Sequence, residues 1–99
     1  MSVFSTPDGT AVTYVTVVHT DACHFCEDAQ DALAEIAREL PLRLELIPAT
    51  SAAGAQLVRA HRPAMFPLVL VDGAYFSVGR LPRRKLRTVL AGRRVVTAR

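Results

Sequence analysis

Two cysteines mark the junction between a strand-like segment and a helix-like one, and this junction constrains the fold more than any other feature of the chain. The run Val12–His19 is β-branched or aromatic at nearly every position, which predicts a buried strand. Cys23 and Cys26 follow, and Cys26 begins a stripe of apolar residues at steps of three and four, made of Cys26, Ala29, Leu33, Ile36, Ala37 and Leu40. We therefore expect the cysteines to open a helix directly after a buried strand.

This placement predicts different roles for the two thiols. Cys23 lies at the helix start, where unpaired backbone N–H groups and the helix dipole favour a thiolate, so we expect it to be exposed and to attack a disulfide. Cys26 lies on the buried stripe and would resolve the mixed disulfide. Asp21 or Thr20 is placed to cap the helix. A protonated His24 would lower the pKa of Cys23, whereas a His24 turned to solvent would not.

Two other uses of the cysteine pair are buried packing and half of a zinc site. Zinc needs two further ligands, and the candidates His19, His24 and His61 do not repeat the paired spacing of a zinc finger. A Cys-x-x-Cys pair between a strand and an amphipathic helix favours redox chemistry over both. We expect no bound metal or cofactor, with a low-molecular-weight thiol as a candidate co-substrate.

The composition predicts one domain. The chain has 99 residues and 51% hydrophobic content, enough for a core over about 12–92, flanked by an N-terminal extension at 1–11 and a basic tail at 93–99. The sequence holds no run of 18 apolar residues and does not open like a signal peptide, so we expect a cytoplasmic monomer that does not enter a membrane. In a reducing compartment a cysteine pair is more often catalytic or metal-binding than structural.

The net charge of +3 hides an asymmetry along the chain. Eight of the nine acidic residues fall at or before Glu45, whereas the segment Arg80–Arg99 carries seven arginines, one lysine and no acid. We interpret this basic segment as a solvated helix face and do not expect nucleic acid as a partner.

Two further elements are predicted after the first helix. The segment Leu42–Ile47 alternates apolar with charged residues and is followed by a proline, which predicts a second strand near a sheet edge. Within 49–64, Ser51 is placed to cap a helix, although Gly54 weakens the helical pattern.

The last third of the chain predicts a hairpin and a helix. Two apolar runs at 66–71 and 74–79 flank an Asp-Gly turn, and Pro82 opens a helix that we expect to end near Gly92. The complete order is β-α-β-α-β-β-α. It predicts an α/β fold with a mixed four-stranded sheet and helices on both faces.

This order resembles the thioredoxin fold, and the segment Cys23-His24-Phe25-Cys26-Glu27-Asp28-Ala29 is similar to that of small bacterial glutaredoxin-like proteins with a Cys-His-x-Cys motif. The resemblance runs from about Tyr14 to Leu90. It implies that Pro67, before the third strand, follows a cis peptide bond and faces the cysteines. The backbone of Phe66 would then pair with an extended substrate.

The sequence departs from these families in the residues that hold substrates. Thioredoxins have a buried aspartate where this chain has Val17, which makes it more similar to glutaredoxins. Of the Gly-Gly-x-Asp-like stretch that holds glutathione, only Gly79 survives, and Arg80 has the charge to grip a carboxylate. Phe66 is bulkier than the usual residue before the proline and is expected to narrow the groove.

The resulting hypothesis is a glutaredoxin-like thiol–disulfide oxidoreductase acting on a small-molecule or protein disulfide, and served by a small thiol or a reductase. The candidate substrate-binding residues are Phe25, Phe66, Pro67, Gly79 and Arg80. With Arg59, Arg62 and Arg80 as the nearest cations, we expect poor use of glutathione and better use of an anionic or protein-bound partner. The alternative hypothesis is a binding module of the same fold that holds a metal or an iron–sulfur cluster, or docks a partner without turnover.

Overall fold

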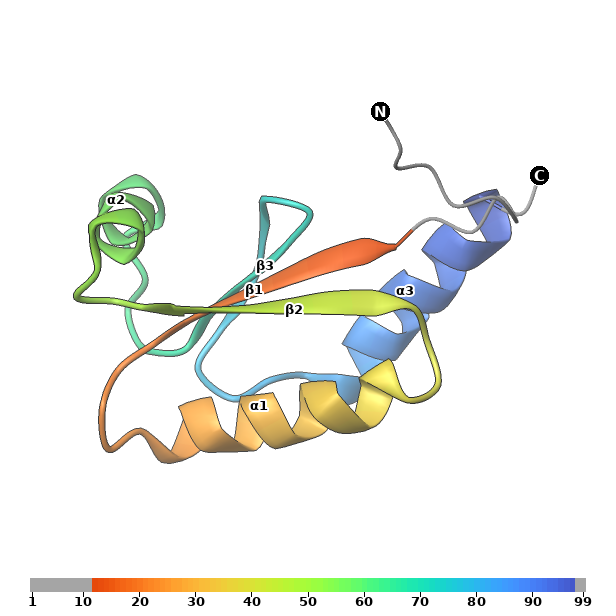
Figure 1. Cartoon of the computed structure of the whole chain (residues 1–99), viewed down its shortest axis with the longest axis horizontal. Coiled ribbons are helices and arrows are strands. Elements are labelled where there is room, and N and C mark those ends of the chain that lie inside the picture. Colours follow the sequence, from red (N-terminus) through yellow and green to blue (C-terminus); the bar gives the residue numbers. More distant parts are fainter. Residues whose placement is uncertain (1–11, 98–99) are drawn as a thin grey trace.

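The computed structural model describes residues 12–97, which form four strands and three helices in the predicted order (Figure 1). The N-terminal extension predicted at 1–11 lies outside the described residues. The elements are β1 (Thr13–His19), α1 (His24–Ala37), β2 (Leu42–Pro48), α2 (Ala52–His61), β3 (Leu68–Val71), β4 (Ala74–Val78) and α3 (Arg83–Thr97). No helix in this part of the chain combines the length and the apolar character needed to cross a bilayer.

The strands form one mixed four-stranded sheet, as predicted, and its strand order is β2-β1-β3-β4. β1 is parallel to β2, to which it is connected through α1, and antiparallel to β3, while β3 and β4 form the antiparallel hairpin. β2 therefore lies at an edge, as its alternating sequence predicts. In the central strand β1, Val15, Val17 and Val18 are fully buried, but Tyr14 is 54% exposed, so the predicted buried strand has one exposed position.

Two apolar layers hold the helices to opposite faces of this sheet (Figure 1). Alternation along each strand sends successive side chains to opposite faces. The layer under α1 and α3 contains Val15, Val17, Val69, Val71, Leu33, Ile36, Leu86 and Leu90. The layer under α2 contains Val18, Leu68, Leu70, Leu57 and Val58.

The start of α2 is fixed to the end of β2. The Ser51 hydroxyl accepts a hydrogen bond from Gly54 N at 3.0 Å and donates one to Pro48 O at 2.7 Å, so the predicted cap is confirmed. Gly54 is buried, and a Cβ at this position would overlap Pro48 O and lie 2.9 Å from Ala49 Cα. The glycine that weakens the helical pattern in the sequence is thus what allows α2 to approach β2 closely.

The hairpin turn has the expected chemistry. Asp72 and Gly73 both have positive φ, 50° and 83°, and connect the paired residues Val71 and Ala74. This is the two-residue turn for which Asp-Gly is preferred. β3 begins at Leu68, two residues later than the predicted apolar run.

The predicted end of the last helix is wrong. α3 begins at Arg83, where Pro82 O accepts a hydrogen bond from Leu86 N at 3.0 Å, and continues through Gly92 to Thr97. The predicted tail 93–99 is therefore helical as far as Thr97, and the last two residues lie outside the described part. A glycine within a helix costs only about 1 kcal/mol, and the sequence has no proline after Gly92 to end the helix.

Candidate active site

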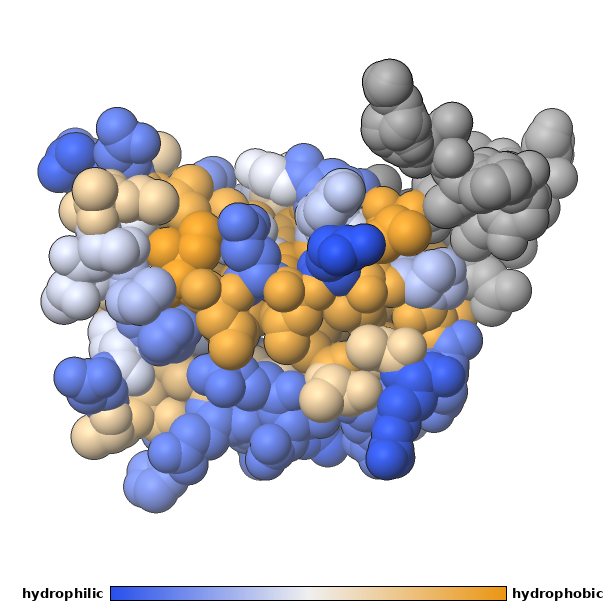
Figure 2. Space-filling model, viewed as in Figure 1, coloured by the Kyte–Doolittle hydropathy of each residue, from blue (hydrophilic) through white to orange (hydrophobic). Residues whose placement is uncertain are grey.

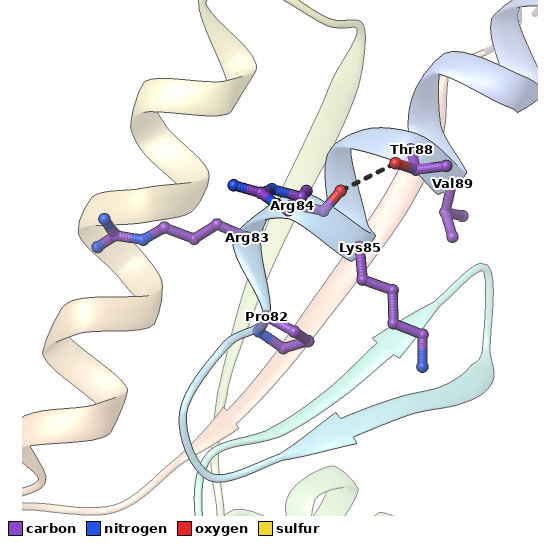
Figure 3. A pocket seen from close by; sticks show the side chains of 6 residues that line it. All are labelled: Pro82, Arg83, Arg84, Lys85, Thr88 and Val89. Carbon is purple, nitrogen blue, oxygen red and sulfur yellow. Dashed lines mark hydrogen bonds between the residues drawn. The ribbon is translucent and has the colours of Figure 1, made fainter.

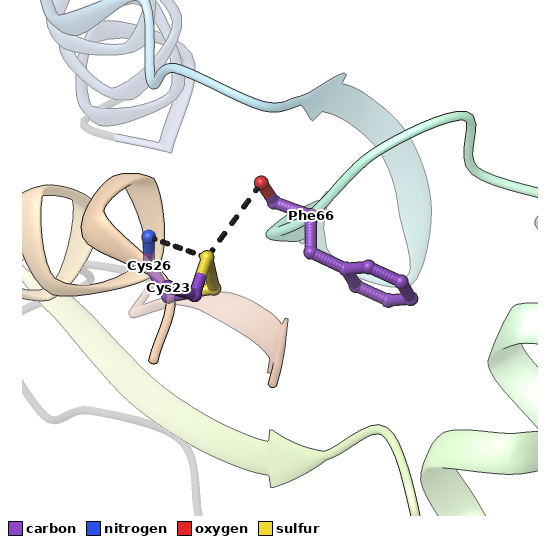
Figure 4. The surroundings of a disulfide bond; sticks show 3 residues. All are labelled: Cys23, Cys26 and Phe66. Carbon is purple, nitrogen blue, oxygen red and sulfur yellow. Dashed lines mark hydrogen bonds between the residues drawn. A yellow bond between two sulfur atoms is a disulfide. The ribbon is translucent and has the colours of Figure 1, made fainter. Parts of the chain in front are cut away.

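Cys23 and Cys26 are joined by a disulfide at the start of α1, with their Cα atoms 5.1 Å apart (Figure 4). The helix begins at His24, so Cys23 occupies the N-cap position with extended backbone angles (φ −116°, ψ 106°). Cys26 is 2% exposed, as its place on the apolar stripe predicts. Cys23 is partly buried and so less exposed than expected, but it is the more exposed of the two cysteines.

The sulfur of Cys23 caps the helix, which corrects the prediction of Asp21 or Thr20. Cys26 N donates a hydrogen bond to Cys23 Sγ at 3.1 Å. Because α1 begins at His24, Asp21 lies two residues too early for the N-cap position. When the disulfide is reduced, the same N–H group is placed to stabilise a Cys23 thiolate.

A loop far away in the sequence faces the disulfide. The Phe66–Pro67 peptide bond is cis, Pro67 is buried, and Phe66 O lies 3.9 Å from Cys23 Sγ (Figure 4). The expected narrowing of the groove by the Phe66 ring is wrong, because the ring points away from the sulfurs and packs on the layer under α2. The backbone of Phe66, and not its side chain, borders the disulfide.

Gly79 connects the end of β4 to this loop. Gly79 N donates a hydrogen bond to Pro67 O at 3.0 Å, and Gly79 has a φ of 74°. A Cβ at Gly79 would lie 2.7 Å from Met65 Sδ, so the glycine also makes room for Met65, which is 46% exposed. Met65 is not among the candidate site residues predicted from the sequence. Its position two residues before Pro67 was the only indication that it would lie near the site. Arg80 follows as an exposed residue.

Solved structures with the same arrangement of elements share little sequence with this chain. An uncharacterized thioredoxin-like protein from Clostridium perfringens superposes with a TM-score of 0.68 at 14% identity, covering 90% of this chain and 76% of that one. A mutant thioredoxin from Halobacterium salinarum gives 0.61 at 13% identity, with 83% and 74% covered. This chain has a thioredoxin-like fold. A Staphylococcus aureus protein of unknown function gives 0.55 at 16% identity, with 87% and 94% covered.

These comparisons establish the fold alone. No protein-family model matches the sequence, and no curated protein matches it significantly. Within the thioredoxin-like fold, the structure brings together Cys23, Cys26, Phe66 and Pro67, with Gly79 bonded to the last of them.

The other predicted residues lie at the surface. His24 and Phe25 occupy the first turn of α1, and Phe25 is 41% exposed. Arg59 and Arg62 are exposed at the C-terminal end of α2, and no hydrogen bond or ion pair within residues 12–97 joins them to the disulfide. In the same part of the chain, no cluster of three or more His, Cys, Asp or Glu side chains is arranged to hold a metal ion.

Part of the basic charge of α3 is paired with acidic residues of α1 and of the turn after it. Arg83 bonds to Asp28 at 2.7 Å and Arg87 bonds to Glu39 at 2.5 Å, both at the surface. The guanidinium of Arg87 lowers the pKa of the Glu39 carboxyl by hydrogen bonding and by its charge. The start of α3 also lines an open depression made by Pro82, Arg83, Arg84, Lys85, Thr88 and Val89 (Figure 3). The predicted solvated face therefore partly contacts α1 and the turn that follows it.

Proposed function

We propose that this chain is a thiol–disulfide oxidoreductase that works by dithiol exchange through Cys23 and Cys26. The observation that carries the proposal is the asymmetry of the pair. Cys23 is the more exposed cysteine and its Sγ accepts a hydrogen bond from Cys26 N at 3.1 Å, whereas Cys26 is 2% exposed. A stabilised, accessible thiolate suits the attacking role, and a shielded thiol suits the resolving role.

The reaction begins from the reduced chain. The Cys23 thiolate attacks one sulfur of a substrate disulfide, forms a mixed disulfide and releases the first substrate thiolate. Cys26 then loses its proton and attacks Cys23 Sγ, which releases the second substrate thiolate and closes the Cys23–Cys26 bond. The substrate gains two electrons, the cysteine pair loses two, and a thiol or dithiol donor of the same chemistry reverses the change on the protein.

The loop before β3 supplies a surface for the substrate. Phe66 O lies 3.9 Å from Cys23 Sγ, so an extended substrate segment that reaches the sulfur also passes this backbone carbonyl. Because the Phe66 ring packs in the layer under α2, it leaves the approach beside its own carbonyl open. Phe25 and Met65 add exposed apolar surface of 41% and 46%. These features support a protein or peptide disulfide as the substrate.

The residues at the end of β4 bear on the choice of donor thiol. Of the residues expected to hold glutathione only Gly79 is present, and its N–H is already bonded to Pro67 O. Arg80 is exposed beside it and can pair with a carboxylate. We therefore propose that glutathione is used poorly and that an anionic or protein-bound donor is used better.

Single-cysteine variants test the proposed roles. In Cys26→Ser, Cys23 should react with a disulfide substrate and remain trapped as the mixed disulfide, which intact-protein mass spectrometry detects as an adduct. In Cys23→Ser, exchange should be lost. An adduct on Cys26 of Cys23→Ser, with none on Cys23 of Cys26→Ser, would reverse the assignment.

Parallel reduction of the oxidised protein tests the donor. Glutathione, other low-molecular-weight thiols and a thioredoxin reductase are supplied separately, and closure or opening of the disulfide is followed by alkylation and mass. Rapid reduction by glutathione would show that the missing residues do not matter. Failure of every donor, together with visible absorbance or bound zinc in the purified protein, would favour a metal- or cluster-binding module.

A further inference from the structure

The outer edge of β2 is unpaired within residues 12–97, where β2 bonds only to β1. Thr13 N donates to Pro41 O and Ala49 N donates to His19 O, so odd-numbered residues around β2 face β1. Alternate residues of a strand turn their N–H and C=O groups to opposite sides. The even-numbered residues, Leu42, Leu44 and Leu46, therefore turn theirs outward.

Two prolines limit this free edge. Pro41 precedes the strand, and Pro48 ends it with no N–H group and with its carbonyl bonded to Ser51 N at 3.0 Å. Between them the edge carries no proline or bulge of the kind that protects edge strands. Leu46 is 44% exposed, and Figure 2 shows a band of hydrophobic surface over β2.

The charged residues of β2 lie together on one face of the sheet. Arg43 and Glu45 are both exposed and, being two residues apart, project to the same side. Glu45 Oε1 accepts a hydrogen bond from Thr16 Oγ1 at 3.3 Å, which places Arg43 and Glu45 on the face away from α1 and α3. Leu42 and Leu44 project to the opposite face and pack against the layer under α1.

We propose that β2 pairs antiparallel with β2 of a second copy of this chain, about a two-fold axis through Leu44. Leu44 then bonds to Leu44 of the second copy, and Leu42 bonds to Leu46 in both directions, so that every outward N–H and C=O of these leucines is paired. On the other face, Arg43 of each copy lies directly opposite Glu45 of the other. Opposite charges at such positions stabilise a sheet.

The charge pattern selects this register over its neighbours. An axis through Arg43 would place that residue opposite itself, and an axis through Glu45 would do the same for the carboxylate. Like charges directly opposite each other are destabilising. An axis through Leu46 would bring Pro48 opposite Leu44 and lose hydrogen bonds. This self-complementarity identifies a second copy, and not an unrelated peptide, as the occupant of the edge.

The pairing replaces the monomer expected from the sequence with a reversible dimer. The interface consists of one short strand from each copy, so we expect weak association that depends on protein concentration. Neither cysteine nor the Phe66–Pro67 loop belongs to β2. Changes at Arg43 or Glu45 should therefore leave disulfide exchange per chain unaltered.

Charge exchange on the full-length chain tests the register. Arg43→Glu places two acids on each edge and Glu45→Arg places two bases, so each variant should dimerise at least about tenfold more weakly than wild type in sedimentation equilibrium. An equal mixture of the two should form a dimer tighter than either alone, and the double exchange should restore the wild-type constant. Circular dichroism confirms that each variant is folded.

Two results would overturn the proposal. A wild-type chain that is monomeric at every concentration would exclude pairing of β2 with a second copy and would leave the edge to another occupant, such as residues 1–11 or a peptide. A dimer whose constant is the same in both single variants and their mixture would place the interface elsewhere.

Discussion

Replacing Gly54 by alanine tests how closely α2 is held to β2. A Cβ at this position would overlap the carbonyl oxygen of Pro48 and lie 2.9 Å from Ala49 Cα. Both are backbone atoms, one in the last residue of β2 and one in the turn that follows it, so no change of rotamer relieves the contact. Helix propensity acts in the opposite direction and favours alanine by about 1 kcal/mol at most.

The magnitudes decide the sign of the effect. Carbon atoms in contact prefer a separation of about 3.5 Å, so α2 would have to move by roughly 0.6 Å or more away from Ala49. Overpacking of this kind costs about 1–3 kcal/mol, and the shift also stretches the Ser51 cap, which is worth about 1 kcal/mol. We expect Gly54→Ala to lower the free energy of unfolding by about 1–3 kcal/mol. The midpoint temperature should fall by about 4–8 °C for each kcal/mol.

Gly92→Ala is the matched control. Gly92 lies within α3, and a Cβ there would meet no atom within 4 Å. Alanine should therefore stabilise the chain by about 0.8–1.0 kcal/mol through helix propensity alone. Urea and thermal unfolding followed by circular dichroism measure both variants. Stabilisation by Gly54→Ala would refute the close approach of α2 to β2, and destabilisation by Gly92→Ala would contradict the continuation of α3 through this residue.

Three further changes test single interactions. Ser51→Ala should lower the free energy of unfolding in urea by about 1 kcal/mol, and an unchanged midpoint would show that the cap contributes nothing. Arg87 lowers the pKa of Glu39, so the ion pair contributes stability above the ordinary pKa of a glutamate that is lost as the pH falls through the pKa of the folded form. The stability difference between wild type and Glu39→Gln should therefore disappear in acid, and a difference independent of pH would contradict this account. In Cys26→Ser, thiolate absorbance should show that Cys23 titrates below about 8.5, and a higher value would remove the capping N–H as a stabilising group.

The order of the elements and the disulfide site follow from local sequence patterns. The β-branched run before the cysteines, the apolar stripe after them and the Asp-Gly turn each satisfy short-range rules, and the structure confirms the strand, the helix and the turn. The stripe is confirmed in part, because Ala37 is exposed and Leu40 lies beyond the end of α1. The difference in burial between Cys23 and Cys26 was also predictable, because it depends only on position within one helix.

The details that were wrong depend on atoms far apart in the sequence or on the exact start of a helix. The identity of the cap changed because α1 starts at His24, and a difference of one or two residues decides which side chain reaches the free N–H groups. The direction of the Phe66 ring depends on its contact with the α2 layer, which no local pattern describes. The role of Gly54 depends on the approach of Pro48, and periodicity can report only that a glycine weakens a helix.

The most direct test of the central claim is a redox titration of the wild-type chain in defined ratios of reduced and oxidised dithiothreitol. The mixtures are quenched with an alkylating agent and weighed by mass spectrometry. We predict one reversible two-electron transition between a doubly alkylated and an unalkylated chain. The ratio of the two forms should change tenfold for each change of about 30 mV in the potential of the dithiothreitol mixture. The assignment of Cys23 and Cys26 as an exchanging pair would be contradicted if titrations started from the oxidised and from the reduced protein gave different ratios of the two forms. It would also be contradicted if the two forms did not interconvert.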